Sequence, residues 1–310
     1  MPQSAVVTGG AGFIGSHVVD RLLEAGTRTV VVDDMSTGRR ENLAAALERG
    51  AVLHELDVRD TAAMRALLDE VRPAAVLHLA ARASVTRSVQ APEEDAAVNL
   101  GGTLALLEAA RRAGVPRFVY VSTGGALYGD AEVIPTPEEA PIRPLSPYGA
   151  SKWAGELYCD LYARLHGLST VTLRLANIYG PRQDPFGEGG VVAIFCQRLR
   201  AGERATVFGD GRQTRDYVYV GDVADITVQA ADAPATGALN VGTGTETSVL
   251  ELADELGRVV GSEDFQPEHG PERPGEVRRS CLDPARAAEQ LGWRAATPLG
   301  DGLRATLESF

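Results

Sequence analysis

Over the first 175 residues of this chain, short apolar runs rich in valine alternate with amphipathic stretches. Because the runs are apolar at consecutive positions, each predicts a strand that is covered on both faces. The stretches between them have the spacing of helices with one apolar side. Strand and helix in alternation predict an α/β protein with a doubly wound parallel sheet. The predicted strands are residues 5–7, 29–32, 52–53, 75–79, 118–121 and 170–175, and clear helices are 13–25 and 61–71.

A glycine-rich segment, TGGAGFIGSH at residues 8–17, lies between the first predicted strand and the first helix. Gly9, Gly12 and Gly15 fit the pattern G-x-x-G-x-x-G, and Gly10, Gly12 and Gly15 fit G-x-G-x-x-G. Glycine at these points permits a tight turn and lets backbone N–H groups at a helix start reach a pyrophosphate. An ordinary glycine-rich turn is the alternative. The strand before, the helix after and an acidic residue at the end of the next strand favour a dinucleotide site.

That acidic residue is Asp33, which is followed by Asp34. A carboxylate at this strand end accepts hydrogen bonds from the adenosine ribose hydroxyls and repels a 2′-phosphate, so it selects NAD over NADP. Arg39 and Arg40 lie a few residues further on and are alternative partners for such a phosphate. Because Asp33 occupies the strand end itself, we predict that the cofactor is NAD.

Lys152 is the single lysine among thirty basic residues, and it follows Tyr148 by four positions. Ser146 and Pro147 suit the cap and first position of a helix, which places Tyr148 and Lys152 one turn apart on one face. A nearby ammonium group lowers the pKa of a phenol, as an oxidised nicotinamide also does. A chance pair on an exposed helix is the alternative. Coming after a dinucleotide segment, the pair predicts catalytic residues.

Composition excludes several classes of function. The 42 acidic and 30 basic residues give a net charge of −12, the wrong sign for a nucleic-acid-binding protein. No apolar run reaches the length of a membrane span, and no secretory signal begins the sequence, so we expect a cytoplasmic protein. Cys159, Cys196 and Cys281 are far apart, and the five histidines lack metal-ligand spacing. We therefore expect neither a disulfide framework nor a metal site.

The sequence becomes rich in glycine and proline after Leu175, and the later elements are shorter. We predict that residues 1–176, with about 216–243, form a Rossmann-like NAD-binding domain. Residues 177–215 and 244–310 are predicted to form a smaller C-terminal α/β domain that binds the substrate.

The glycine motif and the Tyr148–Lys152 pair resemble those of the extended short-chain dehydrogenase/reductase family, and the resemblance covers essentially the whole chain. The family's third catalytic group is a Ser or Thr at the end of the fifth strand, which implies Thr123 here, with Ser122 as the alternative. In some members the hydroxyl lies four residues before a Tyr-Gly pair, and that position is Gly124 in this chain. The resemblance also implies a homodimer formed through residues 92–113 and 148–166.

The resemblance extends the set of expected cofactor contacts beyond the glycine segment. Asp57 and Val58 after the third strand would contact the adenine, and residues 79–81 after the fourth strand would contact the ribose and phosphate region. Asn99, in the next helix, would also contact the cofactor. The full expected set is Gly9, Gly12, Phe13, Ile14, Gly15, Asp33, Asp34, Asp57, Val58, Leu79, Ala80, Ala81, Asn99, Tyr148 and Lys152.

The segments around Thr123, Tyr148 and Asn177 are most similar to those of the UDP-glucose (UDP-galactose) 4-epimerases, one group within that family. Sugar 4,6-dehydratases place an Asp-Glu pair after the hydroxyl, whereas Gly124 and Gly125 stand here. The resemblance therefore implies NAD-dependent inversion at C4 of a UDP-hexose through a transient 4-keto sugar, with the cofactor regenerated in each cycle. The expected substrate-binding residues are Thr123, Tyr148, Asn177, Val191, Phe208, Arg215, Arg273, Glu276 and Ser280.

Ser280 bears on the choice of sugar, because some family members place a tyrosine there that crowds the 2-substituent. The smaller serine predicts room for an N-acetyl group. Two other functions stay open at this point. One is epimerisation or 4-keto reduction of UDP-glucuronate or a dTDP-sugar, for which Arg82, Arg87 and Arg182 are the only hints of a carboxylate partner. The other is a non-catalytic dinucleotide-binding protein, which would not need to keep Tyr148, Lys152 and a hydroxyl together.

Overall fold

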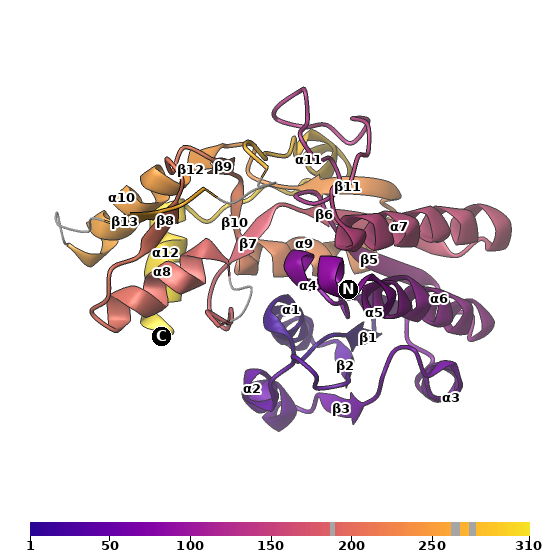
Figure 1. Ribbon diagram of the computed structural model, residues 1–310. Helices are drawn as coiled ribbons and strands as arrows, with labels where there is room; N and C mark the ends of the chain where they lie inside the picture. The colour runs from indigo at the N-terminus through magenta and orange to yellow at the C-terminus, as the bar shows by residue number, and fades with distance from the viewer. Residues whose placement is uncertain (187–189, 262–266, 273–276) are drawn as a thin grey trace.

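The computed structural model describes residues 1–186, 190–261, 267–272 and 277–310. Its main sheet has seven strands in the order β11-β6-β5-β4-β1-β2-β3, and every neighbouring pair is parallel. The predicted α/β fold with a doubly wound, Rossmann-like sheet is confirmed (Figure 1). The strands are β1 (Ser4–Thr8), β2 (Arg28–Asp33), β3 (Val52–Glu55), β4 (Ala75–His78), β5 (Arg117–Thr123), β6 (Ser169–Leu175) and β11 (Gly237–Val241).

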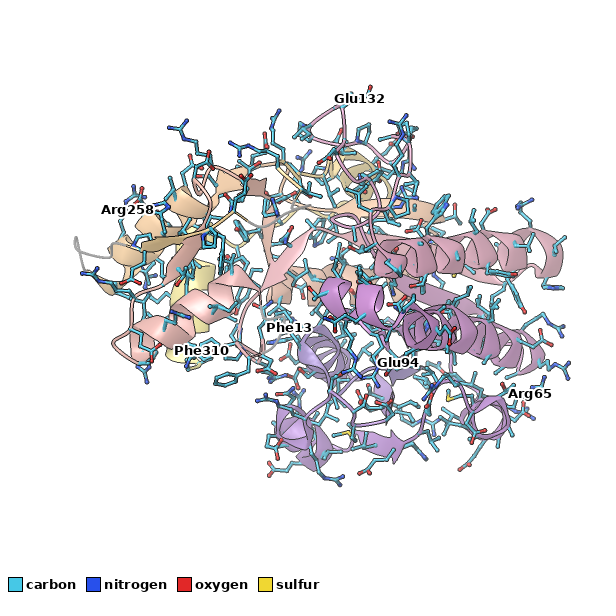
Figure 2. The ribbon with its side chains drawn as sticks, viewed as in Figure 1. Phe13, Arg65, Glu94, Glu132, Arg258 and Phe310 are labelled. Carbon is cyan, nitrogen blue, oxygen red and sulfur yellow. The ribbon has the colours of Figure 1, made fainter. Side chains whose placement is uncertain are left out.

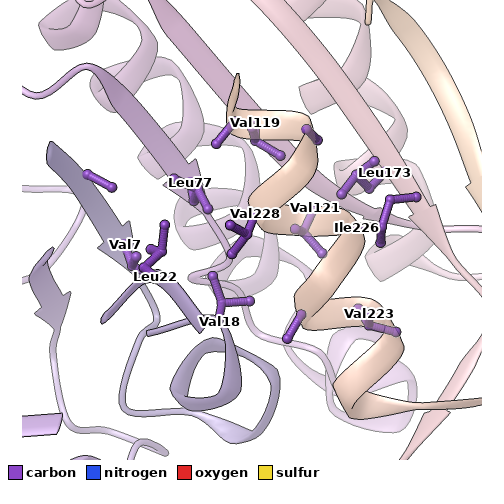
Figure 3. Close-up of a cluster of buried hydrophobic side chains, with 14 of the residues drawn as sticks. Val7, Val18, Leu22, Leu77, Val119, Val121, Leu173, Val223, Ile226 and Val228 are labelled. Carbon is purple, nitrogen blue, oxygen red and sulfur yellow. The ribbon is translucent and has the colours of Figure 1, made fainter. Parts of the chain in front are cut away.

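One face of the sheet is covered by α1 (Phe13–Glu24) and α9 (Val220–Asp232). Val7, Leu77, Val119 and Leu173 on the strands pack against the apolar sides of these two helices (Figure 3). The central strands are buried at successive residues because helices cover both faces, which explains their continuous apolar runs.

The other face is covered by α3 (Thr61–Val71), α6 (Thr103–Arg112) and α7 (Pro147–His166). The predicted start of α7 is confirmed, because Ser146 caps it by accepting from Gly149 N and Pro147 is its first residue. Residues 92–113, expected at the dimer interface, form α5 (Pro92–Ala96), a π-helical stretch (Ala97–Gly102) and then α6. A short helix, α4 (Val85–Gln90), precedes them.

Smaller elements after β6 form a second core. Within it β7 (Asn177–Tyr179) pairs with β10 (Tyr217–Tyr219), β9 (Thr214–Arg215) with β12 (Thr247–Ser248), and β8 (Thr206–Phe208) with β13 (Glu268–Gly270). Three helices complete this unit: α8 (Val191–Arg200), α10 (Val249–Val260) and α12 (Leu299–Glu308). Figure 2 shows Arg258 and Phe310 in this unit and Phe13 at the beginning of α1. The remaining elements are a 3₁₀ turn (Arg40–Leu43), α2 (Ala44–Glu48) and α11 (Ala285–Leu291).

A segment near the C-terminus packs into the core of the main sheet. Ala287 of α11 and Trp293 lie in the core of the sheet's first face, although both fall inside the predicted second domain. We propose that the chain divides into its two domains at about residues 176, 216 and 243, as predicted, with the α11 region packed onto the first domain. Among the described helices, none combines the length and apolar character needed to cross a membrane.

Candidate active site

The turn between β1 and α1 brings two backbone segments into contact at the carboxyl edge of the sheet. Gly9 has a φ of +70°, and a Cβ there would lie 2.6 Å from Ala80 N, which follows β4. A Cβ on Gly15 would overlap the carbonyl oxygen of Gly9. Gly12 is the N-cap of α1 and no side chain caps it, so the first N–H groups of the helix lack a side-chain acceptor. This cradle fits a pyrophosphate.

Asp33 stands at the end of β2, directly beside this cradle, and is 6% exposed. Its two carboxylate oxygens accept hydrogen bonds from Ala11 N (2.9 Å) and Met35 N (3.0 Å), which fix its orientation. Burial raises the pKa of Asp33, and these two hydrogen bonds oppose the shift. Arg39 is paired with Asp184 (3.1 Å) and Arg40 with Glu55 (3.0 Å). Both arginines thus have acidic partners, and the carboxylate end of β2 fits the ribose of NAD.

A cavity of about 250 Å³ extends from the cradle along the carboxyl ends of β1, β2, β4 and β5. Twelve of the fifteen expected cofactor-binding residues line it: Gly9, Gly12, Phe13, Ile14, Gly15, Asp33, Asp34, Asp57, Val58, Leu79, Ala80 and Ala81. The structure therefore brings together residues that lie as far apart in sequence as Gly9 and Ala81. Their individual contacts to a cofactor stay predictions.

Tyr148, Lys152 and Asn99 are not among the residues that line this cavity. Of the three, Asn99 is held by hydrogen bonds to other segments of the protein. It is 1% exposed, and its amide donates to Arg82 O (3.0 Å), Asp95 Oδ1 (2.9 Å) and Ser151 Oγ (3.2 Å). Its Oδ1 accepts from Arg82 N (2.8 Å). The side chain is thus engaged by the protein itself, and it holds the segment after β4 against α5 and α7.

Thr123 and Tyr148, which are 25 positions apart in sequence, come together beside the carboxyl end of β5. The Thr123 hydroxyl acts to lower the pKa of the Tyr148 phenol, so the two side chains lie near each other, and Val121, two residues before Thr123, lines the cavity. Ser122, the alternative hydroxyl, is 3% exposed, and within the described residues its Oγ has no hydrogen-bond partner. Successive side chains of β5 point to opposite faces of the sheet, so Ser122 lies on the same face as Tyr120, which is the face covered by α6 and α7. Thr123 is the last residue of the strand. The geometry favours Thr123 as the hydroxyl that acts with Tyr148.

Lys152 lies one turn after Tyr148 on α7 and is 3% exposed. Its Nζ lies 4.5 Å from the ring centroid of Tyr120, a cation–π contact inside the protein. Burial lowers the pKa of Lys152 to about 8, and the charges of Glu156, Cys159 and Asp95 oppose the shift.

Tyr148 has a pKa of about 12, raised chiefly by burial and also by Asp95. In the protein without a cofactor, burial therefore outweighs the lowering of this pKa by Thr123. The expectation that Lys152 and an oxidised nicotinamide together favour phenolate stays a prediction. A further positive charge close to the phenol is needed to favour phenolate at neutral pH. The carboxyl edge of the sheet, where the NAD cavity lies, is the place for such a charge.

The predicted substrate-binding residues other than Thr123 and Tyr148 follow β6 in the sequence, and five of them are described: Asn177, Val191, Phe208, Arg215 and Ser280. Asn177 begins β7, and its Oδ1 would lie 3.7 Å from a Cβ on Gly125, so it faces the turn after Thr123. Phe208 lines a separate cavity with Gly209, Asp210, Gln213, Glu272 and Arg278. Val191 begins α8, Arg215 ends β9, and Ser280 N donates to Thr214 O (3.2 Å). Arg273 and Glu276 lie outside the described residues.

Sequence reasoning missed several residues that line the NAD cavity, including Ser36, Thr37 and Arg82. Each lies close after a predicted segment: Ser36 and Thr37 are two and three residues after Asp34, and Arg82 follows Ala81. Extending each predicted segment by up to three residues would have found them. Arg82 is also 3.5 Å from Glu94, and Arg182 pairs with Asp20 (2.8 Å), so neither is an unpaired group for a sugar carboxylate.

Comparisons with known proteins agree with this geometry. The model of the "NAD dependent epimerase/dehydratase family" matches residues 5–242. A protein of Mycolicibacterium smegmatis named UDP-glucose 4-epimerase is 49% identical over 308 residues, which cover 98% of this chain and 97% of the relative. The crystal structure of UDP-glucose 4-epimerase from Thermotoga maritima with UDP-glucose has a TM-score of 0.95 at 46% identity, covering 99% of this chain and 98% of that one. The Thermus thermophilus UDP-glucose 4-epimerase complex with NAD has a TM-score of 0.90 at 43% identity, with the same coverage.

The buried ammonium of Lys152 predicts a distinctive dependence of stability on pH. Its folded pKa of about 8 lies below the ordinary 10.5. Between these values the unfolded chain binds more protons, so the stability of the wild type rises with pH through this window. We expect that Lys152→Met removes this rise. In cofactor-free protein, the free energy of unfolding of the wild type should gain roughly 3 kcal/mol relative to the variant between about pH 7 and about pH 10.5.

Urea unfolding at both pH values measures this difference. Lys152→Arg is the matched control, because its guanidinium stays charged throughout the window and should show no gain. Parallel pH dependence of the wild type and Lys152→Met would contradict the prediction.

Proposed function

The chain belongs to the NAD dependent epimerase/dehydratase family, and we propose that it is a UDP-glucose 4-epimerase, which interconverts UDP-glucose and UDP-galactose. The observation that carries this proposal is the proximity of Thr123 to Tyr148 at the end of β5, a strand whose Val121 lines the cavity that fits NAD. Full-length similarity to proteins of that name supports it. Gly124 and Gly125 occupy the positions where the resemblance places the carboxylate pair of a dehydratase, which favours epimerisation over loss of water.

The residues of this chain would manage the proton and orient the sugar. Tyr148 takes the proton of the sugar's 4-hydroxyl group, and Thr123 donates or accepts the hydrogen bond that holds that oxygen beside the phenol. NAD, when bound, supplies reversible acceptance of hydride from C4. The 4-keto sugar rotates in the site, so that hydride returns to the opposite face of C4. Tyr148 then returns the proton to the C4 oxygen. No net oxidation occurs, so the cofactor stays with the protein.

Lys152 would have an electrostatic role in this scheme. Its side chain is buried beside Tyr120 and one turn from Tyr148, so its charge acts in a medium of low dielectric constant. Because its pKa is about 8, it carries a proton at neutral pH and favours the phenolate form of Tyr148.

The UDP portion would bind to the second unit. Arg215 and Arg273 are proposed for the diphosphate, Glu276 for the uridine ribose, and Val191 and Phe208 for the uracil surroundings. A guanidinium pairs well with a pyrophosphate because its N–H groups form two parallel hydrogen bonds. Asn177, which faces the turn after Thr123, is proposed to contact the diphosphate-sugar portion, and Ser280 leaves room for an N-acetyl group.

The test of function is to incubate purified protein with each UDP-hexose, and with UDP-GlcNAc and UDP-GalNAc, without added cofactor. We expect inversion at C4 and retention of bound NAD, identified by chromatography of the released cofactor. Tyr148→Phe should lower turnover about 10³-fold while NAD stays bound. Products lacking C4 inversion, or full activity of the phenylalanine variant, would refute the proposal. Absence of N-acetyl turnover would remove only the part that concerns Ser280.

The two adjacent hydroxyls give a second prediction. Thr123→Val should lower kcat about 100-fold, because the hydrogen bond to the reacting oxygen is lost while the side-chain volume is kept. Ser122→Ala should leave kcat within about twofold, because its buried Oγ has no partner to lose. Steady-state kinetics on both variants, with circular dichroism to confirm folding, decides between them. A larger loss in Ser122→Ala would reverse the assignment.

We also propose that the protein is a homodimer formed through α7 and the adjacent α6. The outward side of α7 presents Leu157 and Leu165, which are 50% and 65% exposed, in line with Ala150, Ala154 and Leu161. This spacing gives an apolar stripe along the helix, and such a stripe favours association. A second copy of the chain is the occupant that the family resemblance implies.

Sedimentation of the wild type and of Leu157→Glu/Leu165→Glu tests the dimer. We expect the wild type to sediment as twice the chain mass of 32.7 kDa, and the double variant as a monomer. Val52→Glu, at a side chain that is also 50% exposed but lies on β3, should remain dimeric. A monomeric wild type would end this proposal.

A further inference from the structure

Asp216 lies between β9 and β10 and is 0% exposed. Its Oδ1 accepts from Thr243 N (2.9 Å) and Thr243 Oγ1 (2.6 Å). Its Oδ2 accepts from Leu282 N (3.2 Å) and Gly244 N (3.4 Å), with Cys281 Sγ at 3.9 Å. Burial raises the pKa of Asp216, and the hydrogen bonds oppose the shift. Both oxygens thus face donors, which is a surrounding that suits a carboxylate.

These hydrogen bonds join three segments that the proposed substrate site needs. Asp216 directly follows Arg215, and its carbonyl oxygen accepts from Asn177 N (2.9 Å). Leu282, held through its N–H, lies two residues after Ser280. The buried side chain of Asp216 therefore joins the segment of the diphosphate partner to Thr243 and to the segment that carries Ser280, and its backbone carbonyl holds the start of β7.

The same contact reaches the turn that follows Thr123. The Leu282 side chain packs against Gly124, where an added Cβ would overlap it. A second link comes from Thr136, whose N–H donates to Cys281 O (2.8 Å) and whose carbonyl accepts from Asp283 N (2.9 Å). Movement of residues 281–283 would therefore be transmitted to the loop between Thr123 and Tyr148.

We propose that Asp216 is a positioning residue for the nucleotide sugar: it sets where the diphosphate partner and the sugar-facing segment stand relative to Thr123. The inference rests on the proposed function and deepens it. In Asp216→Asn, one carboxylate oxygen is replaced by an NH₂ group that faces N–H or O–H donors. The hydrogen bonds to that oxygen are lost, so the segments that they hold would separate. The NAD cradle on β1, β2 and β4 makes no use of this junction, so cofactor binding should be unaffected.

Asp222 offers a matched control. It is also buried, at 7% exposed, and its carboxylate accepts from Ala296 N (3.2 Å), Thr297 N (3.0 Å) and Thr297 Oγ1 (3.1 Å). Asp222 thus also holds a C-terminal segment through a buried carboxylate, but that segment carries none of the predicted substrate-binding residues. A general loss of packing should appear equally in Asp216→Asn and Asp222→Asn.

The experiment measures kcat, KM for UDP-glucose, bound NAD, melting temperature and the Kd of UDP-glucose for both variants. We expect both to melt earlier, and only Asp216→Asn to raise KM and Kd by about tenfold or more. Its NAD content should equal that of the wild type. Equal KM changes in the two variants, or loss of NAD from Asp216→Asn, would overturn the inference.

Thr243 provides a milder variant in case Asp216→Asn does not fold. Thr243→Ala removes one donor to Asp216 and should raise KM about threefold, while Thr243→Ser keeps the hydroxyl and should restore it. An unchanged KM in Thr243→Ala, or no recovery in Thr243→Ser, would count against Asp216. If the wild type neither binds nor converts UDP-glucose, the proposed function fails, whereas normal wild-type binding with unaltered variants fails the Asp216 inference alone.

Discussion

The backbone contact between the β1–α1 turn and the end of β4 is the constraint on which the site depends. A side chain at Gly9 would push Ala80 away, and one at Gly15 would push Gly9 away. Because Gly9 and Gly15 have no side chains, the turn before α1 and the segment after β4 lie in direct backbone contact. The N–H groups of an uncapped helix and the ends of parallel strands are then aimed at the same space. The register of β1, β2 and β3 then places the expected cofactor residues from Asp33 to Val58 relative to this backbone contact.

The electrostatics of the site follow from how deeply its groups are buried. In the protein alone, burial holds Tyr148 protonated at neutral pH, whereas Lys152, with a pKa of about 8, still carries its proton. Under the proposed mechanism, an oxidised nicotinamide bound close to the phenol would lower the pKa of Tyr148. Burial would then make the proton acceptor depend on the presence of the hydride acceptor.

Sequence patterns predicted the sheet, the cap of α7 and the residues of the cradle because each depends on local chemistry. Apolar runs report burial on both faces, and Ser146-Pro147 reports a helix start within one turn. The choice between Ser122 and Thr123 was beyond the sequence, because it depends on where β5 ends relative to α7. The same holds for Asn99: its type suits a ligand contact, but its four protein partners come from three separate segments. The π-helical stretch before α6 likewise had no local signal.

The distance between Thr123 and Tyr148 is set by residues outside the site. The loop joining them is held by Arg174, which donates to the Tyr128 hydroxyl (2.8 Å) and to Glu138 O (3.1 Å) and pairs with Glu156 (2.7 Å). Both members of that pair are 5% exposed, so removal of either would leave a buried charge without its partner. Glu156 lies one turn after Lys152 on α7 and also opposes the fall in the pKa of that lysine.

One buried ion pair thus fixes the catalytic loop and supports the charge beside the phenol. Such a pair contributes little to net stability compared with an apolar equivalent, because desolvation offsets most of the attraction. Its geometric effect is larger, since the guanidinium group reaches the helix, the loop and the strand at once. The loop between Thr123 and Tyr148 is therefore held by a buried charge network that includes neither of these two residues.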